Sequence, residues 1–262
     1  MGLAALVAAA VLAATPVSFV QSHATAGAFA ESGGTADAAL TSWAVLGLRA
    51  AGAGAPGSLA YLQSQDASLT STTDVALVAL AEQALGGTAD ALLARLRAAQ
   101  RPSGQVGATL NSTYWAVLAL GHSSPATTRF MLAQQTKAGG FSWFAHGQPD
   151  SNDTAAALEA LRVAGVHGQP IRRAVRFILT FENKDGGFEL TRGRGSDAQS
   201  TAWVIQGLVA AGRTPPRAAF AYLARLRRSD GSYRYSTKYA ATPVWVTSQV
   251  LAALAKKPFP LA

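Results

Sequence analysis

The sequence repeats itself about every 41 residues along nearly its whole length. The clearest pair is AALTSWAVLGLRAAG at 38–52 and AQSTAWVIQGLVAAG at 198–212, each directly after an aspartate. Aligning the other segments with these two places one threonine in every unit, at Thr41, Thr73, Thr113, Thr154, Thr201 and Thr247. A leucine follows each threonine seven residues later. Six copies of one unit indicate a repeat architecture in which neighbouring units share a core.

Each unit predicts a pair of helices. The first begins near a proline and is amphipathic, as in residues 217–227. A turn of glycine and an aromatic residue ends it, as in Gly139-Gly140-Phe141. The second helix carries the threonine and the leucine and has almost no charge. A helix that is apolar nearly all round must be buried on all sides.

Burying six such helices requires a closed ring, because an open array would expose one of their faces to water over a large area. We therefore predict an all-α fold, an α/α toroid with six inner and six outer helices. It forms a single domain over residues 15–262, with any cavity at the ends of the inner helices. The second and third units lack the full Gly-Gly-aromatic turn, so the pattern is weaker there.

The first 14 residues are interpreted separately, as a signal peptide. Residues 2–14 are small and apolar, a run too short for the roughly 20 residues of a spanning helix but typical of a signal-peptide core. We expect export of the chain, as a secreted or cell-envelope protein. No Lys or Arg precedes the run, and a buried helix is the alternative reading. No other stretch is apolar enough to span a bilayer.

Composition excludes several chemistries. The chain has no cysteine, which rules out disulfides, thiolate nucleophiles, cysteine-ligated zinc and iron–sulfur clusters. Its net charge is +8, and residues 132–262 hold 17 of the 22 basic side chains. These are spaced as on solvated helix faces, without the basic stripe and stacking aromatics of nucleic-acid readers, so we expect no nucleic-acid partner. Contact of the basic half with a membrane or cell-wall surface remains an open alternative.

The units resemble degenerate repeats of the squalene-cyclase and prenyltransferase toroid superfamily. That family's segment runs from a basic residue through Gln to a Gly-x-Trp turn, and Arg129, Gln134, Gly139 and Phe141 follow this order with Phe in place of Trp. The resemblance covers residues 15 to about 258 and implies the same α/α toroid. It is specific for the fold and carries little information on activity.

We expect no metal and no cofactor. The superfamily's zinc branches use a cysteine among their metal ligands, and this chain has none. Its four histidines share no position of the repeat, and only His146, Asp150 and Asp153 are close in sequence. A zinc site needs three or four convergent ligands.

Residues 150–155, DSNDTA, align with the Asp-x-Asp-Asp-Thr-Ala motif of the class II terpene cyclases, which the resemblance implies as the enzymatic alternative. That branch places its proton donor where this chain has Asn152, and an amide has no proton of useful acidity. Asp150 shares its repeat position with Asp37 and Asp197, which is typical of helix N-caps. Asp153 has no acidic counterpart in other units and is the candidate catalytic residue, with a first-turn acid favoured by the helix dipole as the alternative.

Aromatic residues supply the other binding candidates. Trp43, Trp115 and Trp203 share one repeat position and are interpreted as packing between helices. Others depart from the repeat and lie near predicted loops at one rim, where they could line a pocket for an apolar or planar ligand; core packing is the alternative for each. The full set of predicted binding residues is Asp150, Asn152, Trp143, Phe144, Tyr233, Tyr235 and Trp245, with Tyr239 in the same aromatic group.

Three classes of function remain. The first, which we favour, is an exported and non-catalytic protein that binds a small hydrophobic ligand at the toroid mouth, similar to the toroid domains of cobalamin carriers. The second is a terpene cyclase-like enzyme that uses Asp153. The third is a ring that binds a protein partner without a ligand.

Overall fold

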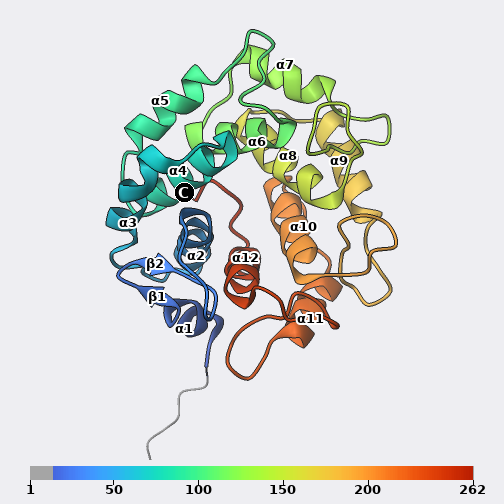
Figure 1. Cartoon of the computed structure of the whole chain (residues 1–262). Coiled ribbons are helices and arrows are strands. Elements are labelled where there is room, and N and C mark those ends of the chain that lie inside the picture. The colour runs from blue at the N-terminus through green and yellow to red at the C-terminus, as the bar shows by residue number, and fades with distance from the viewer. Residues whose placement is uncertain (1–13, 262) are drawn as a thin grey trace, which may run out of the picture.

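The computed structural model describes residues 14–261, which form one closed ring of helices (Figure 1). The outer helices of the described chain are α1 Pro16–Gln21, α3 Ser58–Gln65, α5 Asp90–Ala98, α7 Pro125–Ala133, α9 Gln169–Leu179 and α11 Arg217–Leu226. The inner helices are α2 Ala38–Ala50, α4 Thr72–Ala84, α6 Leu110–Leu120, α8 Ser151–Val163, α10 Ala198–Ala210 and α12 Pro243–Ala255. The predicted α/α toroid is confirmed.

Smaller elements complete the described chain. A short antiparallel hairpin of β1 Ala24–Thr25 and β2 Ala28–Phe29 follows α1, and the 3-10 helix η1 Asp66–Ser68 follows α3. None of the helices in residues 14–261 is long and apolar enough to cross a membrane. All but the last residue of the predicted signal peptide, 1–14, lies outside the described residues.

Contacts between the first and last units close the ring. Each inner helix packs against the next, and α12 packs against α2. The carboxylate of Glu31, in the first unit, accepts hydrogen bonds from the backbone N–H groups of Val244 (3.0 Å) and Trp245 (2.9 Å) at the start of α12. These N–H groups have no partner within their own helix, so Glu31 supplies the cap that α12 lacks.

The inner helices begin where the sequence predicts. Asp37, Asp150 and Asp197 are the N-cap residues of α2, α8 and α10. Each carboxylate accepts a hydrogen bond of 2.7 to 2.8 Å from the backbone N–H three residues later. Such a cap contributes about 1 kcal/mol. The interpretation of these aspartates as N-caps is confirmed.

The repeated threonines have a common structural role. Their Oγ1 atoms accept hydrogen bonds of 2.9 to 3.0 Å from a backbone N–H in the turn before the same helix. The donors are Phe29, Val106, Phe141, Phe188 and Tyr233, and the acceptors are Thr41, Thr113, Thr154, Thr201 and Thr247. This bond ties each turn to its inner helix.

The second unit differs from the predicted alignment. Ser71 is the N-cap of α4, so the residue that matches the other threonines is Val75, four residues after the cap. The repeat alignment predicts Thr73 at this position, which is two residues too early. Its side chain instead lies at the central cavity. An aliphatic residue replaces the repeated threonine in this unit, which hid the register from the sequence pattern.

Glycines in the turns allow adjacent units to pack closely. Gly139 has a φ of 104°, and a Cβ there would lie 2.5 Å from the carbonyl oxygen of Arg173 in α9. Gly231, in the last turn, has a φ of 88°, and a Cβ would lie 2.4 Å from the carbonyl oxygen of Thr15, just before α1. The same contact therefore links consecutive units and also joins the last unit to the first.

The segment after α12 fills one end of the ring, and Figure 1 shows it turning back into the interior. Arg162, near the end of α8, donates a hydrogen bond of 2.8 Å from Nη2 to the carbonyl oxygen of Phe259. The N–H of Phe259 donates to the carboxylate of Glu159. Its ring lies 6.2 Å from that of Trp43 and 6.3 Å from that of Trp115. We call residues 256–261 the closing segment.

Candidate functional site: a tryptophan-lined chamber

A cavity of about 430 Å³ lies at the N-terminal ends of the inner helices. All five tryptophans of the chain line it: Trp43, Trp115, Trp143, Trp203 and Trp245. We call this cavity the tryptophan chamber. Its other lining side chains are Ala39, Thr73, Asp74, Leu77, Asn111, Asp150, Asn152, Asp153, Ala156, Leu190, Gln199 and Gln249.

Three of the tryptophans meet edge to face at the centre of the ring. Trp43, Trp115 and Trp203 come from α2, α6 and α10, which are alternate inner helices. Their ring centroids are 5.4, 5.6 and 5.7 Å apart, with interplanar angles of 86° to 89°. The edge of each indole, which carries partial positive charge, therefore meets the negative face of a neighbour. These rings separate the chamber from the closing segment, because Phe259 contacts two of them from the other end.

Asp153 supplies a buried acid to the chamber wall. It lies in the first turn of α8, is 5% exposed, and accepts a hydrogen bond of 2.7 Å at Oδ1 from Nδ2 of Asn111 in α6. Burial, followed by the neighbouring charge of Asp150, raises its pKa to about 8; the bond from Asn111 acts in the opposite direction. Burial also raises the pKa of Asp150. The two carboxyl groups therefore retain a proton between them at neutral pH.

Two buried amide side chains in the chamber wall have polar atoms without a protein partner. Gln249, on α12, is 1% exposed, and neither its Oε1 nor its Nε2 makes a hydrogen bond within the described chain. Asn111 uses its Nδ2 for Asp153, but its Oδ1 has no such bond. An unpaired polar atom inside a protein costs about 1 to 3 kcal/mol. These atoms are thus available to a molecule that enters the chamber.

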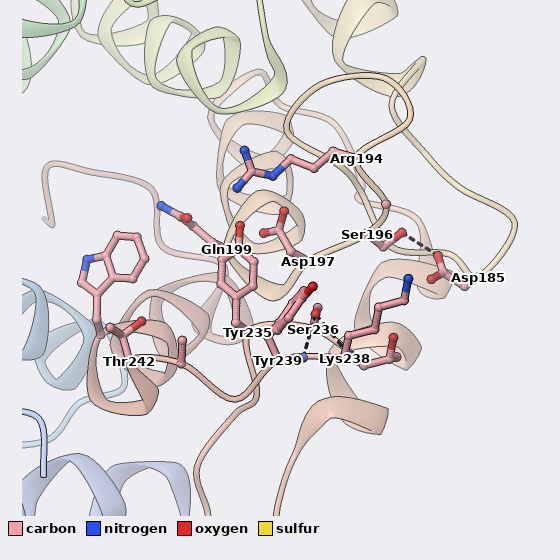
Figure 2. Close-up of a pocket in the computed structure, with 14 residues that line it drawn as sticks. Asp185, Arg194, Ser196, Asp197, Gln199, Tyr235, Ser236, Lys238, Tyr239 and Thr242 are labelled. Carbon is pink, nitrogen blue, oxygen red and sulfur yellow. Dashed lines mark hydrogen bonds between the residues drawn. The ribbon is translucent and has the colours of Figure 1, made fainter.

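A second cavity, of about 830 Å³, adjoins the chamber on the side of α10 and α12, and Figure 2 shows it. The two cavities share Gln199 and Trp245, so we call the second one the vestibule. In Figure 2 Arg194 lies above Asp197, and Lys238 lies below Asp197 on the side of Asp185. The remaining wall is polar and aromatic, with Asp185, Ser196, Tyr235, Ser236, Thr237 and Tyr239 among its residues.

The structure brings most of the predicted site residues to these two cavities. Those that line the chamber are Asp150, Asn152, Asp153, Trp143 and Trp245. Tyr235 lines the vestibule. Tyr233 is buried in the core, where its N–H bonds to Thr247. Phe144 is 60% exposed and lies outside the linings of both cavities.

Sequence reasoning missed part of the wall. The repeat pattern predicts that Trp43, Trp115 and Trp203 pack between helices, and they do pack against one another, but they also form the chamber floor. The signal was present, since one position of the repeat holds them in the first, third and fifth units. Gln249 holds the same position in the sixth. In a closed ring, one repeated position faces the axis from every unit.

Within residues 14–261, no group of three or more His, Asp or Glu side chains is arranged to hold a metal ion. Asp74, Asp150 and Asp153 line the same chamber but do not converge on one point. The chamber therefore offers separate carboxyl groups among aromatic faces.

Comparisons with known proteins identify the fold. No protein-family model matches the sequence, and no curated protein matches it significantly. A variant of the type II terpene cyclase MstE from Scytonema, in complex with its substrate geranylgeranyl dihydroxybenzoate, superimposes with a TM-score of 0.65 at 15% identity, over 92% of this chain and 94% of that one. A protein from Actinoplanes gives a TM-score of 0.67 at 16% identity, over 92% and 97%.

A prenyl-transferring enzyme has the same architecture. Protein geranylgeranyltransferase-I of Candida albicans, complexed with GGPP, superimposes with a TM-score of 0.63 at 13% identity, over 83% of each chain. The resemblance to cyclase and prenyltransferase repeats is thus confirmed at the level of the fold. This chain has the α/α-toroid fold of the type II terpene cyclases and the protein prenyltransferases.

Proposed function

We propose that the chain binds a small, largely apolar ligand in the tryptophan chamber and holds it without catalysing a reaction. The observation that carries the proposal is that every tryptophan of the chain lines this one cavity. Aromatic side chains offer large apolar contact areas and lose little conformational entropy on binding. The cavity, at about 430 Å³, is in the size range of small-molecule sites.

Two further observations support a binding role. Asn152 lines the chamber where the class II cyclases that the chain resembles carry their proton donor, and its amide cannot protonate an alkene. The MstE relative holds a geranylgeranyl compound within the same fold, which supports an apolar ligand for this chain.

Intrinsic fluorescence tests the proposal directly. Because every tryptophan lines the chamber, a ligand that binds there should change tryptophan emission. Trp245 also lines the vestibule, so variants are needed to assign the signal to one cavity. The protein would be purified from its own host and examined by native mass spectrometry to capture the bound molecule, which is then added back to stripped protein. We expect a bound small molecule and a saturable emission change. Repeated absence of any bound molecule would contradict a ligand carrier and favour the partner-binding ring.

Matched variants locate the site. Trp245→Ala removes a half-buried side chain from the wall that the chamber shares with the vestibule, and should weaken binding by about tenfold or more, since an aromatic anchor at a binding site contributes about 2 kcal/mol or more. Phe144→Ala removes an exposed aromatic side chain outside both cavities and should leave the affinity unchanged. Equal losses in both variants would place the ligand elsewhere.

Acid-catalysed cyclisation is the second candidate, and the protonation of Asp153 favours it. A carboxyl group with a pKa of about 8 is mostly protonated at pH 7 and lines an apolar chamber. Its proton would form a new C–H bond with an alkene, using the π electrons and leaving a carboxylate and a carbocation. A second alkene would close that cation into a ring, and the new cation would lose a proton to a carboxylate of Asp150 or Asp153, which gives a neutral cyclic alkene and restores the acid. We expect a panel of isoprenoids to give no cyclised product. A product that disappears in Asp153→Asn would establish the enzyme instead.

Export of the chain remains part of the proposal. It rests on the apolar run at residues 2–14, which matches a signal-peptide core in length and composition. Fractionation of the native host, with N-terminal sequencing of the mature chain, tests it. We expect the protein outside the cytoplasmic membrane and a new N-terminus near residue 15. A cytoplasmic protein that retains residues 2–14 would contradict export.

A further inference from the structure

The charges around the tryptophan chamber are one-sided. Asp74, Asp150 and Asp153 line it, and none of its lining residues is Lys, Arg or His. The chain as a whole has the opposite balance, with 22 basic and 14 acidic side chains. Carboxyl groups are therefore concentrated at one apolar cavity of a strongly basic protein.

The tryptophans that line the chamber, like its carboxylates, favour a positively charged ligand. The face of an indole ring carries a negative quadrupole and attracts a cation within about 6 Å of its centroid. Trp143 and Trp245 lie at the chamber rim, and the three central indoles lie at its floor. Aromatic cages that recognise ammonium ligands likewise gather several aromatic side chains around one cavity.

A second, independent observation also indicates a ligand. Gln249 is almost completely buried in the chamber wall, and its amide oxygen and nitrogen have no protein partner. The Oδ1 atom of Asn111 in the same wall is likewise unpaired. Both oxygen atoms carry partial negative charge and stabilise a nearby cation through the amide dipole. The free-energy cost of burying these polar groups is offset when such a ligand is bound.

We propose that the ligand of the tryptophan chamber is an organic ammonium cation that carries apolar or aromatic groups. This inference rests on the proposed binding function and specifies the chemical class of the ligand. The apolar groups contact the tryptophans, and the charged nitrogen lies near Asp153, Asn111 and Gln249. A neutral hydrocarbon of the same shape would offer no positive charge to the carboxylate and the amide oxygens.

Binding of such a cation is coupled to proton release. Without ligand, burial and the proximity of Asp150 keep Asp153 protonated at neutral pH. A cation in the chamber favours the ionised carboxylate, so the affinity should rise with pH until the pair is fully ionised. The other groups that face this pair or the same chamber are Asn111 and Tyr114 from α6, Asp74 from α4, Gln199 from α10 and Gln249 from α12, with Arg194 and Lys238 in the adjoining vestibule.

An isosteric pair of probes tests the charge requirement. Benzyltrimethylammonium and neopentylbenzene have the same shape and differ in the quaternary atom, which is charged nitrogen in one and carbon in the other. Their affinities for the full chain are measured by tryptophan fluorescence titration at pH 6, 7 and 8. At pH 8 we expect benzyltrimethylammonium to bind at least about tenfold more tightly than neopentylbenzene. Its affinity should rise by up to about tenfold for each unit of pH between pH 6 and 8.

The possible results separate the two proposals. Equal or tighter binding of neopentylbenzene overturns the proposal that the ligand is a cation and leaves the proposed binding of an apolar ligand in place. Binding of neither probe contradicts both. A cation preference that does not change with pH contradicts the proposal that Asp153 is the group that interacts with the charged nitrogen of the ligand.

Variants assign the preference to residues. Asp153→Asn keeps the size of the side chain and should abolish the pH dependence and most of the cation preference, while neopentylbenzene still binds. Asp90→Asn changes an exposed acid on the outer helix α5 and should alter neither affinity. Gln249→Leu should weaken the cation relative to neopentylbenzene. Unchanged cation affinity in both chamber variants would overturn the proposal.

Discussion

The two ends of the ring contain similar acids in different settings. Asp153 at the chamber end and Glu159 at the other end both lie on α8, and burial is the first cause that raises the pKa of each to about 8. Glu159 accepts a hydrogen bond from Phe259 of the closing segment. Asp153 bonds to Asn111 and lines an open cavity.

The difference shows that a shifted pKa alone does not identify a functional site. Both acids are removed from water to a similar degree, but at one end the chain itself fills the space beside the acid. At the other end, indole rings and unpaired amide atoms line a cavity. The free space beside the acid distinguishes a candidate site from a structural contact, because an unpaired buried atom, Oε1 of Glu159, also occurs at the closed end.

Removing the side chain that fills the closed end should have the largest effect on stability. Phe259→Ala deletes a ring that is 1% exposed and packed against Trp43 and Trp115. We expect the free energy of unfolding to fall by about 3 to 5 kcal/mol, as for other buried Phe to Ala changes. Urea unfolding followed by circular dichroism measures this, with Phe144→Ala as the exposed control. A loss below about 1 kcal/mol would show that the closing segment is not packed as described.

The pH dependence of stability compares the two acids. Because the folded-state pKa values of Asp153 and Glu159 are raised, the native state binds more protons than the unfolded state between about pH 4.5 and 8. Stability should therefore fall as the pH rises through this window, by up to about 1.4 kcal/mol per unit for each group.

Glu159→Gln and Asp153→Asn should each make this decline shallower. Urea unfolding at pH 5, 6, 7 and 8 gives the slopes. Part of the decline should persist in both variants, because burial also raises the pKa of Glu82, to about 7. A steeper or unchanged decline in both variants would contradict the assigned protonation states.

Removing the hydrogen bond that the repeated threonine accepts should have an intermediate effect on stability. Thr154→Val leaves the buried N–H of Phe141 without its acceptor and should cost about 1 to 2 kcal/mol. Thr73→Val changes the threonine that lies outside this pattern, and its cost should stay within about 0.5 kcal/mol. Thermal or urea unfolding compares the two. Equal costs would argue against the register in which Val75 occupies the repeated position.

The smallest effect on stability is expected at the rim of the open end. Trp143 is 46% exposed, so Trp143→Ala should change the free energy of unfolding by about 0.5 kcal/mol or less. The same variant should weaken ligand binding, because Trp143 lines the chamber. Unfolding and ligand titration on one preparation separate the two properties. A large stability loss with unchanged affinity would make Trp143 a packing residue.

The ring itself was predictable from the repeat. Six inner helices with almost no charge cannot remain buried in an open array, and the structure closes them as that argument requires. The caps at Asp37, Asp150 and Asp197 were also predictable, because an N-cap depends on residues close in sequence. The turn glycines likewise marked the ends of the outer helices. The one misplaced register, at Thr73, arose where the repeated residue itself had changed.

The sequence alone therefore determined the local features of the fold: the starts of the helices, the turns and the number of units. Only the tertiary structure decided that Trp43, Trp115 and Trp203 meet at the axis and that Phe259 returns to pack beneath two of them. It also decided which buried polar atoms stay unpaired. The physical reason is that these side chains belong to units tens of residues apart, and they come into contact only when the ring closes.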